Sequence, residues 1–260
     1  MTIIVPTDFS ATANNAANYA VRMLHGTYDN TLILYHVYDK AADEADAQAN
    51  MDLLKSEMQS QGAVKIETRC ELNSDFINSL ERLARHFSAG LVVMGITGKS
   101  RLEQVFFGSN TLKMVERNVC PVLIVPPAAQ FTKVTNVALT SDFHDVRHSI
   151  PHVPIKRTLE LFRPSLHIVN VNSEHYVSLT EEYLEQRGLL VEMFREFNPE
   201  FYFIGTYNVE ETIQTFVMDK NIDMLITVPR QRNLFASFYK TSTTRKLAYE
   251  STVPILAAHE

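Results

Sequence analysis

Residues 91–109 read LVVMGITGKSRLEQVFFGS, an apolar run followed by a segment that contains three glycines and ends in a serine. The run at Leu91–Met94 predicts a strand, and the residues from Asn110 to Arg117 predict a helix. Backbone N–H groups at a strand-to-helix turn and at a helix N-terminus bind anions, and glycines let the main chain approach phosphate oxygens closely. The stretch therefore predicts an anion site at the turn between a strand and a helix.

The same alternation of strands and helices continues on both sides of this stretch. Short apolar runs predict strands, and patterns with a helical period predict helices, with Ser10 as the N-cap of the first helix. Strands that alternate with helices form a parallel, doubly wound sheet. The expected strands are Ile3–Pro6, Leu32–Val37, Val64–Leu72, Leu91–Met94 and Val122–Val125. The expected helices are Ala11–Leu24, 45–60, Asp75–Phe87 and Asn110–Arg117, and the expected buried face of the third helix is Phe76, Leu80, Leu83, Ala84 and Phe87.

The pattern restarts after a linker at Pro126–Gln130, and the restart can be checked by arithmetic. Asp8 recurs as Asp142, an offset of 142 − 8 = 134, and Pro121 recurs as Pro254, an offset of 254 − 121 = 133. Because the offset stays nearly constant along the chain, we predict two homologous α/β domains. The expected domains are residues 1–127 and 134–260.

Composition argues against several classes of protein. The formal net charge is 24 − 30 = −6, whereas a general binder of nucleic acid or of anionic membranes carries a basic surface. Two cysteines are too few for a disulfide framework, so a reducing compartment is expected. The chain begins MTIIVPTD, which is too briefly apolar for a signal peptide, and no later run is long enough to span a membrane. We expect a cytoplasmic protein that binds neither nucleic acid nor membranes.

The glycine loop and three other segments carry a resemblance to a known family. The loop reads G-x2-G-x9-G-S from Gly95 to Ser109, and this pattern resembles the nucleotide-binding signature of the universal stress protein family. VPTDFS at 5–10 and LILYHVYD at 32–39 look like that family's first two strands, and 119–126 looks like its last strand. The resemblance covers essentially the whole chain as a tandem of two family domains. It implies that each domain holds a five-stranded parallel sheet of order 3-2-1-4-5 with helices on both faces.

The resemblance also implies a site for ATP, bound together with magnesium, at the topological switch point between the first and fourth strands. The residues that match the family's adenosine contacts are Pro6, Thr7, Asp8 and Val37. Those that match its phosphate contacts are Gly95, Gly98, Gly108, Ser109 and Asn110. Three roles stay open for Asp8, which could accept a hydrogen bond from ribose or adenine, help to position magnesium, or complement the dipole of the following helix.

The second copy has lost the glycines of this loop. At the offset of 133, Gly95 becomes Val228 and Gly98 becomes Gln231, and both replacements bring a Cβ atom to the place of the phosphates. We therefore expect one nucleotide per chain, in the N-terminal half. Residues 228–246 are basic, and whether they form a solvated surface or bind another anion stays open.

These patterns favour an ATP-binding module of stress response or signalling that has no catalytic residue and is at most a slow ATPase. The alternative is a non-catalytic scaffold that binds an unidentified protein partner and needs no nucleotide. Enzymes that share the layered fold carry motifs such as SGGxDS, which this chain lacks. His144, His148 and His152 have the spacing of metal ligands on a helix, but Pro151 and Pro154 interrupt that helix, so no metal site is predicted.

The last strands of the two copies, Val122–Val125 and Ile255–Ala258, are apolar edges of the kind that a partner strand covers. In the family that the chain resembles, the last strands of two domains commonly pair across a two-fold axis. The short linker keeps the two copies at a high local concentration, so we expect an intramolecular pseudo-dimer. The second domain would then serve chiefly as the pairing partner of the first, and whether whole chains also form a homodimer stays open.

Overall fold

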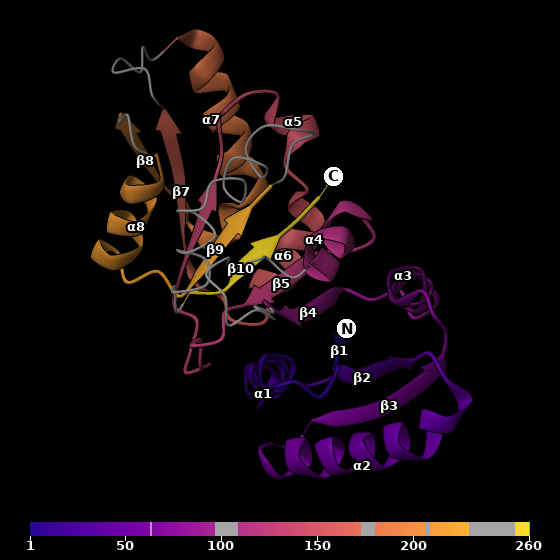
Figure 1. Cartoon of the computed structure of the whole chain (residues 1–260). Coiled ribbons are helices and arrows are strands. Elements are labelled where there is room, and N and C mark those ends of the chain that lie inside the picture. The colour runs from indigo at the N-terminus through magenta and orange to yellow at the C-terminus, as the bar shows by residue number, and fades with distance from the viewer. Residues whose placement is uncertain (63, 97–108, 173–179, 206–208, 229–252, 260) are drawn as a thin grey trace. The chain divides into compact units, whose positions relative to one another are not determined.

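In the computed structural model the chain folds as two compact units. The structure describes all residues except 63, 97–108, 173–179, 206–208, 229–252 and 260 (Figure 1). The described residues up to Thr132 belong to the first unit, and those from Lys133 onward belong to the second. Within the described part of the chain, no helix is long and apolar enough to cross a membrane.

The first unit is a parallel five-stranded sheet with helices on both faces (Figure 1). Its strands follow the order β3-β2-β1-β4-β5, with α1 beside α2 on one face and α3 beside α4 on the other. The strands are β1 (Thr2–Pro6), β2 (Thr31–Tyr38), β3 (Lys65–Leu72), β4 (Leu91–Gly95) and β5 (Val122–Val125). The helices are α1 (Ala11–Leu24), the 3-10 helix η1 (Ala41–Asp43), α2 (Glu44–Ser60), α3 (Phe76–His86) and α4 (Ser109–Glu116).

The second unit repeats this order, with its strands arranged as β8-β7-β6-β9-β10. The strands are β6 (Asn136–Thr140), β7 (Ser165–Asn172), β8 (Glu200–Gly205), β9 (Met224–Thr227) and β10 (Ile255–Ala257). The helices are α5 (Val146–Ser149), α6 (His152–Leu159), α7 (Glu181–Met193), the 3-10 helix η2 (Arg195–Phe197) and α8 (Val209–Asp219). The prediction of two tandem, doubly wound domains of order 3-2-1-4-5 is therefore confirmed.

The central strands are buried on both faces, and for this reason their sequences are continuous apolar runs. Residues 3–5 of β1 and 91–93 of β4 have no exposed surface. Helix α1 begins at the predicted residue because the Ser10 hydroxyl accepts the Ala13 N–H at 3.3 Å. The predicted elements of this unit agree with the observed bounds to within one residue at each end.

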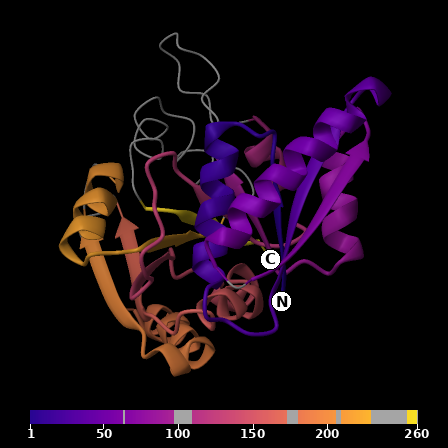
Figure 2. The same ribbon diagram turned by 90° about the horizontal axis from the view of Figure 1, so that it is seen from below.

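The stretch predicted as a linker is fastened to α1, the indigo helix of Figures 1 and 2. The Asn15 side-chain amide donates to Pro126 O and to Ala129 O, both at 3.1 Å. Ala129 has no exposed surface, and the Tyr19 and Phe131 rings meet edge to face at 5.3 Å between centroids. The chain thus stays packed on the first unit through residue 131.

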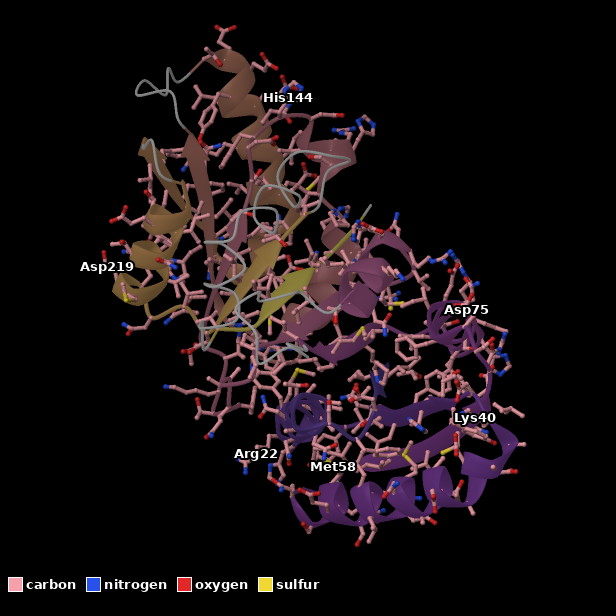
Figure 3. All side chains as sticks on the ribbon, viewed as in Figure 1. Arg22, Lys40, Met58, Asp75, His144 and Asp219 are labelled. Atoms are coloured by element: carbon pink, nitrogen blue, oxygen red, sulfur yellow. The ribbon has the colours of Figure 1, made fainter. Side chains whose placement is uncertain are left out.

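The counterpart of α1 in the second unit is broken in two. Ile150 lies between α5 and α6 with an extended backbone (φ −105°, ψ 110°), and Pro151 precedes α6. The three histidines therefore do not share one helix face, since His144 (labelled in Figure 3) precedes α5, His148 lies within it and His152 begins α6. Among the residues that the structure describes, no group of three His, Cys, Asp or Glu side chains could hold a metal ion.

Replacing Asn15 by alanine should lower the free energy of unfolding by about 1–3 kcal/mol, because two carbonyl groups of the packed stretch lose their donor. Urea-induced unfolding of the full chain, followed by circular dichroism, measures this change. Asn18→Ala is the control, because the Asn18 amide donates to Asn14 O of the same helix and alanine favours that helix. Equal losses in the two variants would contradict a role for the bonds to residues 126 and 129.

Candidate functional site

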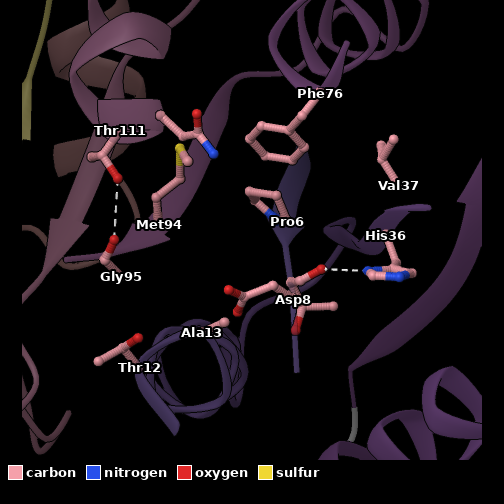
Figure 4. A pocket seen from close by; sticks show the side chains of 12 residues that line it. Pro6, Asp8, Thr12, Ala13, His36, Val37, Phe76, Met94, Gly95 and Thr111 are labelled. Atoms are coloured by element: carbon pink, nitrogen blue, oxygen red, sulfur yellow. Dashed lines mark hydrogen bonds between the residues drawn. The ribbon is translucent and has the colours of Figure 1, made fainter. Parts of the chain in front are cut away.

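A cavity of about 290 Å³ opens at the carboxyl ends of β1 and β4, where the strand order reverses (Figure 4). Ligands of open α/β sheets bind at such a point. The walls of the cavity come from three strands and from the first residues of α1, α3 and α4. The lining residues are Pro6, Thr7, Asp8, Thr12, Ala13, His36, Val37, Phe76, Met94, Gly95, Asn110 and Thr111.

The cavity brings together most of the predicted nucleotide contacts. Those that line it are Pro6, Thr7, Asp8, Val37, Gly95 and Asn110. Ser109 is the first residue of α4, and Gly98 and Gly108 lie outside the described residues. The lining residues that were not predicted are Thr12, Ala13, His36, Phe76, Met94 and Thr111.

A tight turn after β1 presents Asp8 to the cavity. The Thr7 N–H donates to Tyr35 O at 2.8 Å, and the Phe9 N–H donates to Thr7 Oγ1 at 2.9 Å. The Ser10 N–H donates to Asp8 Oδ1 at 3.1 Å. These bonds hold Phe9 in the left-handed region at φ 58°, a conformation that costs a residue with a side chain about 1–2 kcal/mol. The Asp8 side chain stays exposed, with Oδ1 engaged in the turn.

The second unit repeats this turn with the same hydrogen bonds. The Ser141 N–H donates to Val169 O at 3.0 Å, and the Phe143 N–H donates to Ser141 Oγ at 3.1 Å. The His144 N–H donates to Asp142 Oδ1 at 3.1 Å, and Phe143 has a φ of 56°. Because this unit has kept the turn although it has lost the glycines of the loop, the turn is a feature of the fold itself.

His36 on β2 supports the turn of the first unit. Its Nδ1 lies 2.8 Å from Thr7 O, and because a carbonyl oxygen can only accept, Nδ1 carries the proton. The Phe9 ring packs on the imidazole with the centroids 4.4 Å apart. In the second unit the Asn170 amide takes the same place and donates to Ser141 O at 3.0 Å.

Gly95 is required by the packing of α1 against the end of β4. A Cβ atom on Gly95 would lie 2.5 Å from Thr12 O and 2.9 Å from Thr12 C, which are backbone atoms of α1. The Thr111 hydroxyl donates to Gly95 O at 3.1 Å and ties α4 to the same strand end. We expected this glycine to admit phosphate, but the close approach of a helix already excludes any other residue here.

A second hollow of about 440 Å³ adjoins the cavity and shares part of its lining. Phe9 lines this hollow in the first unit. Its counterpart Phe143 is buried among the rings of Tyr183, Phe203 and Phe201, at centroid distances of 5.0, 5.2 and 6.0 Å. Phe9 thus lines a hollow in the first unit, whereas aromatic side chains surround the equivalent Phe143 in the second.

The chain is similar to universal stress proteins in sequence and in structure. The model of the universal stress protein family matches residues 1–126. A universal stress protein of Methanocaldococcus jannaschii is 30% identical over 138 residues, which cover 47% of this chain and 80% of that protein. The crystal structure of a universal stress protein from Archaeoglobus fulgidus matches at a TM-score of 0.69 and 14% identity, covering 100% of this chain and 96% of that one. A universal stress protein in complex with cAMP matches 49% of this chain and 97% of its own, at 25% identity and a TM-score of 0.42.

Gly95→Ala should destabilise the chain by about 1–3 kcal/mol, because the new methyl group forces α1 away from β4. Gly188→Ala is the matched control in α7, where an added Cβ atom would meet no other atom within 4 Å. That variant should instead gain up to about 1 kcal/mol from the higher helix propensity of alanine. Thermal and urea unfolding of both variants measure the difference. A neutral Gly95→Ala would contradict the packing role of this glycine.

Proposed function

Because the chain belongs to the universal stress protein family, we propose that it binds ATP as a module of stress response or signalling. The nucleotide occupies the cavity of the first unit, at one site per chain. Its binding, and not its turnover, is the function, and any hydrolysis is slow.

The cavity at the carboxyl ends of β1 and β4 is the observation that carries this proposal. Its volume of about 290 Å³ is close to the lower end of the roughly 300–1,000 Å³ of small-molecule sites, which suits a nucleoside better than a whole triphosphate. The chain leaves the cavity at Gly95 and enters the glycine loop. We assign the phosphates to that loop, through Gly98, Gly108 and the start of α4 at Ser109.

The distribution of polar groups in the lining supports an orientation for the nucleotide. One part of the lining is apolar and suits a base, and its residues are Pro6, Val37, Phe76 and Met94. Asp8 is an acceptor for the ribose hydroxyls, and Asn110 lies at the start of the helix that we assign to the phosphates. The base would then lie on the side of β2 and α3, and the phosphates on the side of α4.

Magnesium would enter this site with the triphosphate. The ion is bound in proteins through one or two carboxylates together with phosphate oxygens. Asp8 is the carboxylate among the described lining residues, and its Oδ1 accepts the Ser10 N–H, which leaves Oδ2 for the ion or for ribose. Its hydrogen bond within the turn and a contact with a ligand are therefore compatible.

The differences between the two units support a single site per chain. Val228 and Gln231 stand at the positions of Gly95 and Gly98, so side chains replace the glycines. In the second unit, the rings of Tyr183 and Phe203 also pack around Phe143, which lies in the turn after the first strand of that unit. What the second unit retains is the turn at Asp142, which serves the fold.

Isothermal titration of the full chain with ATP, in the presence of magnesium, should give close to one site per chain. The physical reason is that the sequence of the first unit carries the glycine loop, whereas the sequence of the second does not. A stoichiometry near two would contradict the difference between the units. Absence of binding, with or without magnesium, would contradict the proposed function and favour a scaffold that needs no nucleotide.

A matched pair of variants tests the location of the site. Gly98→Val should abolish binding of ATP, because it places a branched side chain against the phosphates. Gln231→Val makes the corresponding change in the second unit and should leave the affinity unchanged. Equal effects of the two substitutions would contradict the assignment of the phosphates to the first unit.

A further inference from the structure

Phe76 faces the cavity, although its neighbours on α3 face the core. The helix buries Ile77, Leu80 and Ala84, whereas Phe76 is half-buried and lines both the cavity and the adjoining hollow. Figure 4 shows its ring beside Pro6, reaching from α3 toward the cavity. An aromatic ring that is incompletely buried at a cavity offers a flat apolar face to a ligand.

Hydrogen bonds hold the backbone on both sides of Phe76. Asp75, labelled in Figure 3, caps α3 by accepting the Asn78 N–H at its Oδ1, at 3.1 Å. The Asn73 N–H donates to Tyr38 O at 2.9 Å and fastens the preceding loop to β2. The backbone that carries the ring is therefore fixed before a ligand arrives, so binding does not have to order this segment.

Glu71, near the end of β3, ties the first turns of α3 to the sheet. It accepts the Tyr35 hydroxyl at 2.6 Å and the Ser79 hydroxyl at 2.9 Å, and both of these side chains are buried. The Asn73 amide donates to the same carboxylate at 3.2 Å. The bond from Ser79 would break if α3 moved outward, so it holds the first turn of the helix, and with it Phe76, close to the sheet.

The lining around Phe76 is apolar and carries no positive charge. Its apolar neighbours in the cavity are Pro6, Val37 and Met94. Among the described residues that line the cavity, none is a lysine or an arginine. Such a wall favours a nucleotide base over a phosphate, because a phosphate would lose its hydration without gaining a partner.

The second unit has lost this aromatic ring together with the glycines. At the offset of 133, Leu80 corresponds to Ile213, and both are buried on their helices. The same offset places Val209 at the position of Phe76. The ring and the glycine loop are therefore present in the same unit and absent from the sequence of the other.

We propose that Phe76 stacks on the purine base of the nucleotide in the first unit and gives the site its preference for purines over pyrimidines. The inference rests on the proposed function, since it names the part of the ligand that this wall contacts. Every base can stack on an aromatic side chain, but the larger ring system of a purine stacks more strongly than that of a pyrimidine. Removal of the ring weakens such binding by about tenfold or more.

Two variants at the opposite ends of α3 test the stacking. Phe76→Ala should raise the Kd for ATP about tenfold or more and bring the affinities for ATP and UTP closer together, whereas Phe76→Tyr should preserve both properties. Phe87→Ala is the control, because it removes another half-buried phenylalanine at the end of the same helix, away from the cavity lining. Its affinities should equal those of the unmodified chain.

A fluorescence experiment supplies a readout that a purely structural role would not move. The chain contains no tryptophan, so Phe76→Trp introduces a single reporter at the wall of the cavity. ATP should quench its emission, whereas the emission of Phe87→Trp should not respond. If the unmodified chain does not bind ATP, the proposed function fails. If it binds ATP but Phe76→Ala matches Phe87→Ala, or the reporter at residue 76 does not respond, the stacking alone is overturned.

Discussion

The site of the first unit depends on how closely α1 approaches the end of β4. At Gly95 the space beside the strand is filled by the backbone carbonyl of Thr12, so that only a residue without a Cβ atom fits. This approach places the start of α1 beside the strand end, and the Thr111 hydroxyl brings α4 to the same point. The cavity lies where these two helix starts meet the turn that holds Asp8. A change in the spacing of α1 and β4 would therefore alter the walls that α1, β4 and α4 contribute to the cavity.

The two units differ at this same contact. Where the first has Gly95 and an unbroken α1, the second has Val228 and a helix divided at Ile150 and Pro151. The sheet order is the same in both, because it depends on buried strands and on right-handed crossovers, which need no glycine here. The fold thus tolerates the loss of the glycine at this position.

Much of the fold could be predicted from the sequence, because central strands of a parallel sheet are continuous apolar runs and helices are amphipathic. Half of the residues around the cavity could be predicted, and these only from the resemblance to a family. The position of Phe76 could not, because the helical period assigned it to the buried face of α3 with Leu80. The structure buries Ile77 instead, since α3 begins at Phe76 and its first side chain projects beyond the core. The packing reason for Gly95 was missed as well, because the neighbour that it faces lies far away in sequence.

The left-handed phenylalanine that follows the first strand of each unit has a consequence for how the duplicated chain has diverged. Glycine at Phe9 or Phe143 would relieve the backbone strain but would forfeit the ring contacts to His36 or Tyr183. Both copies have nevertheless retained phenylalanine, although only one has retained the glycine loop. The turn and its phenylalanine are thus a requirement that both copies of the fold share. A duplicated chain therefore allows a requirement of the fold to be recognised without reference to any other protein.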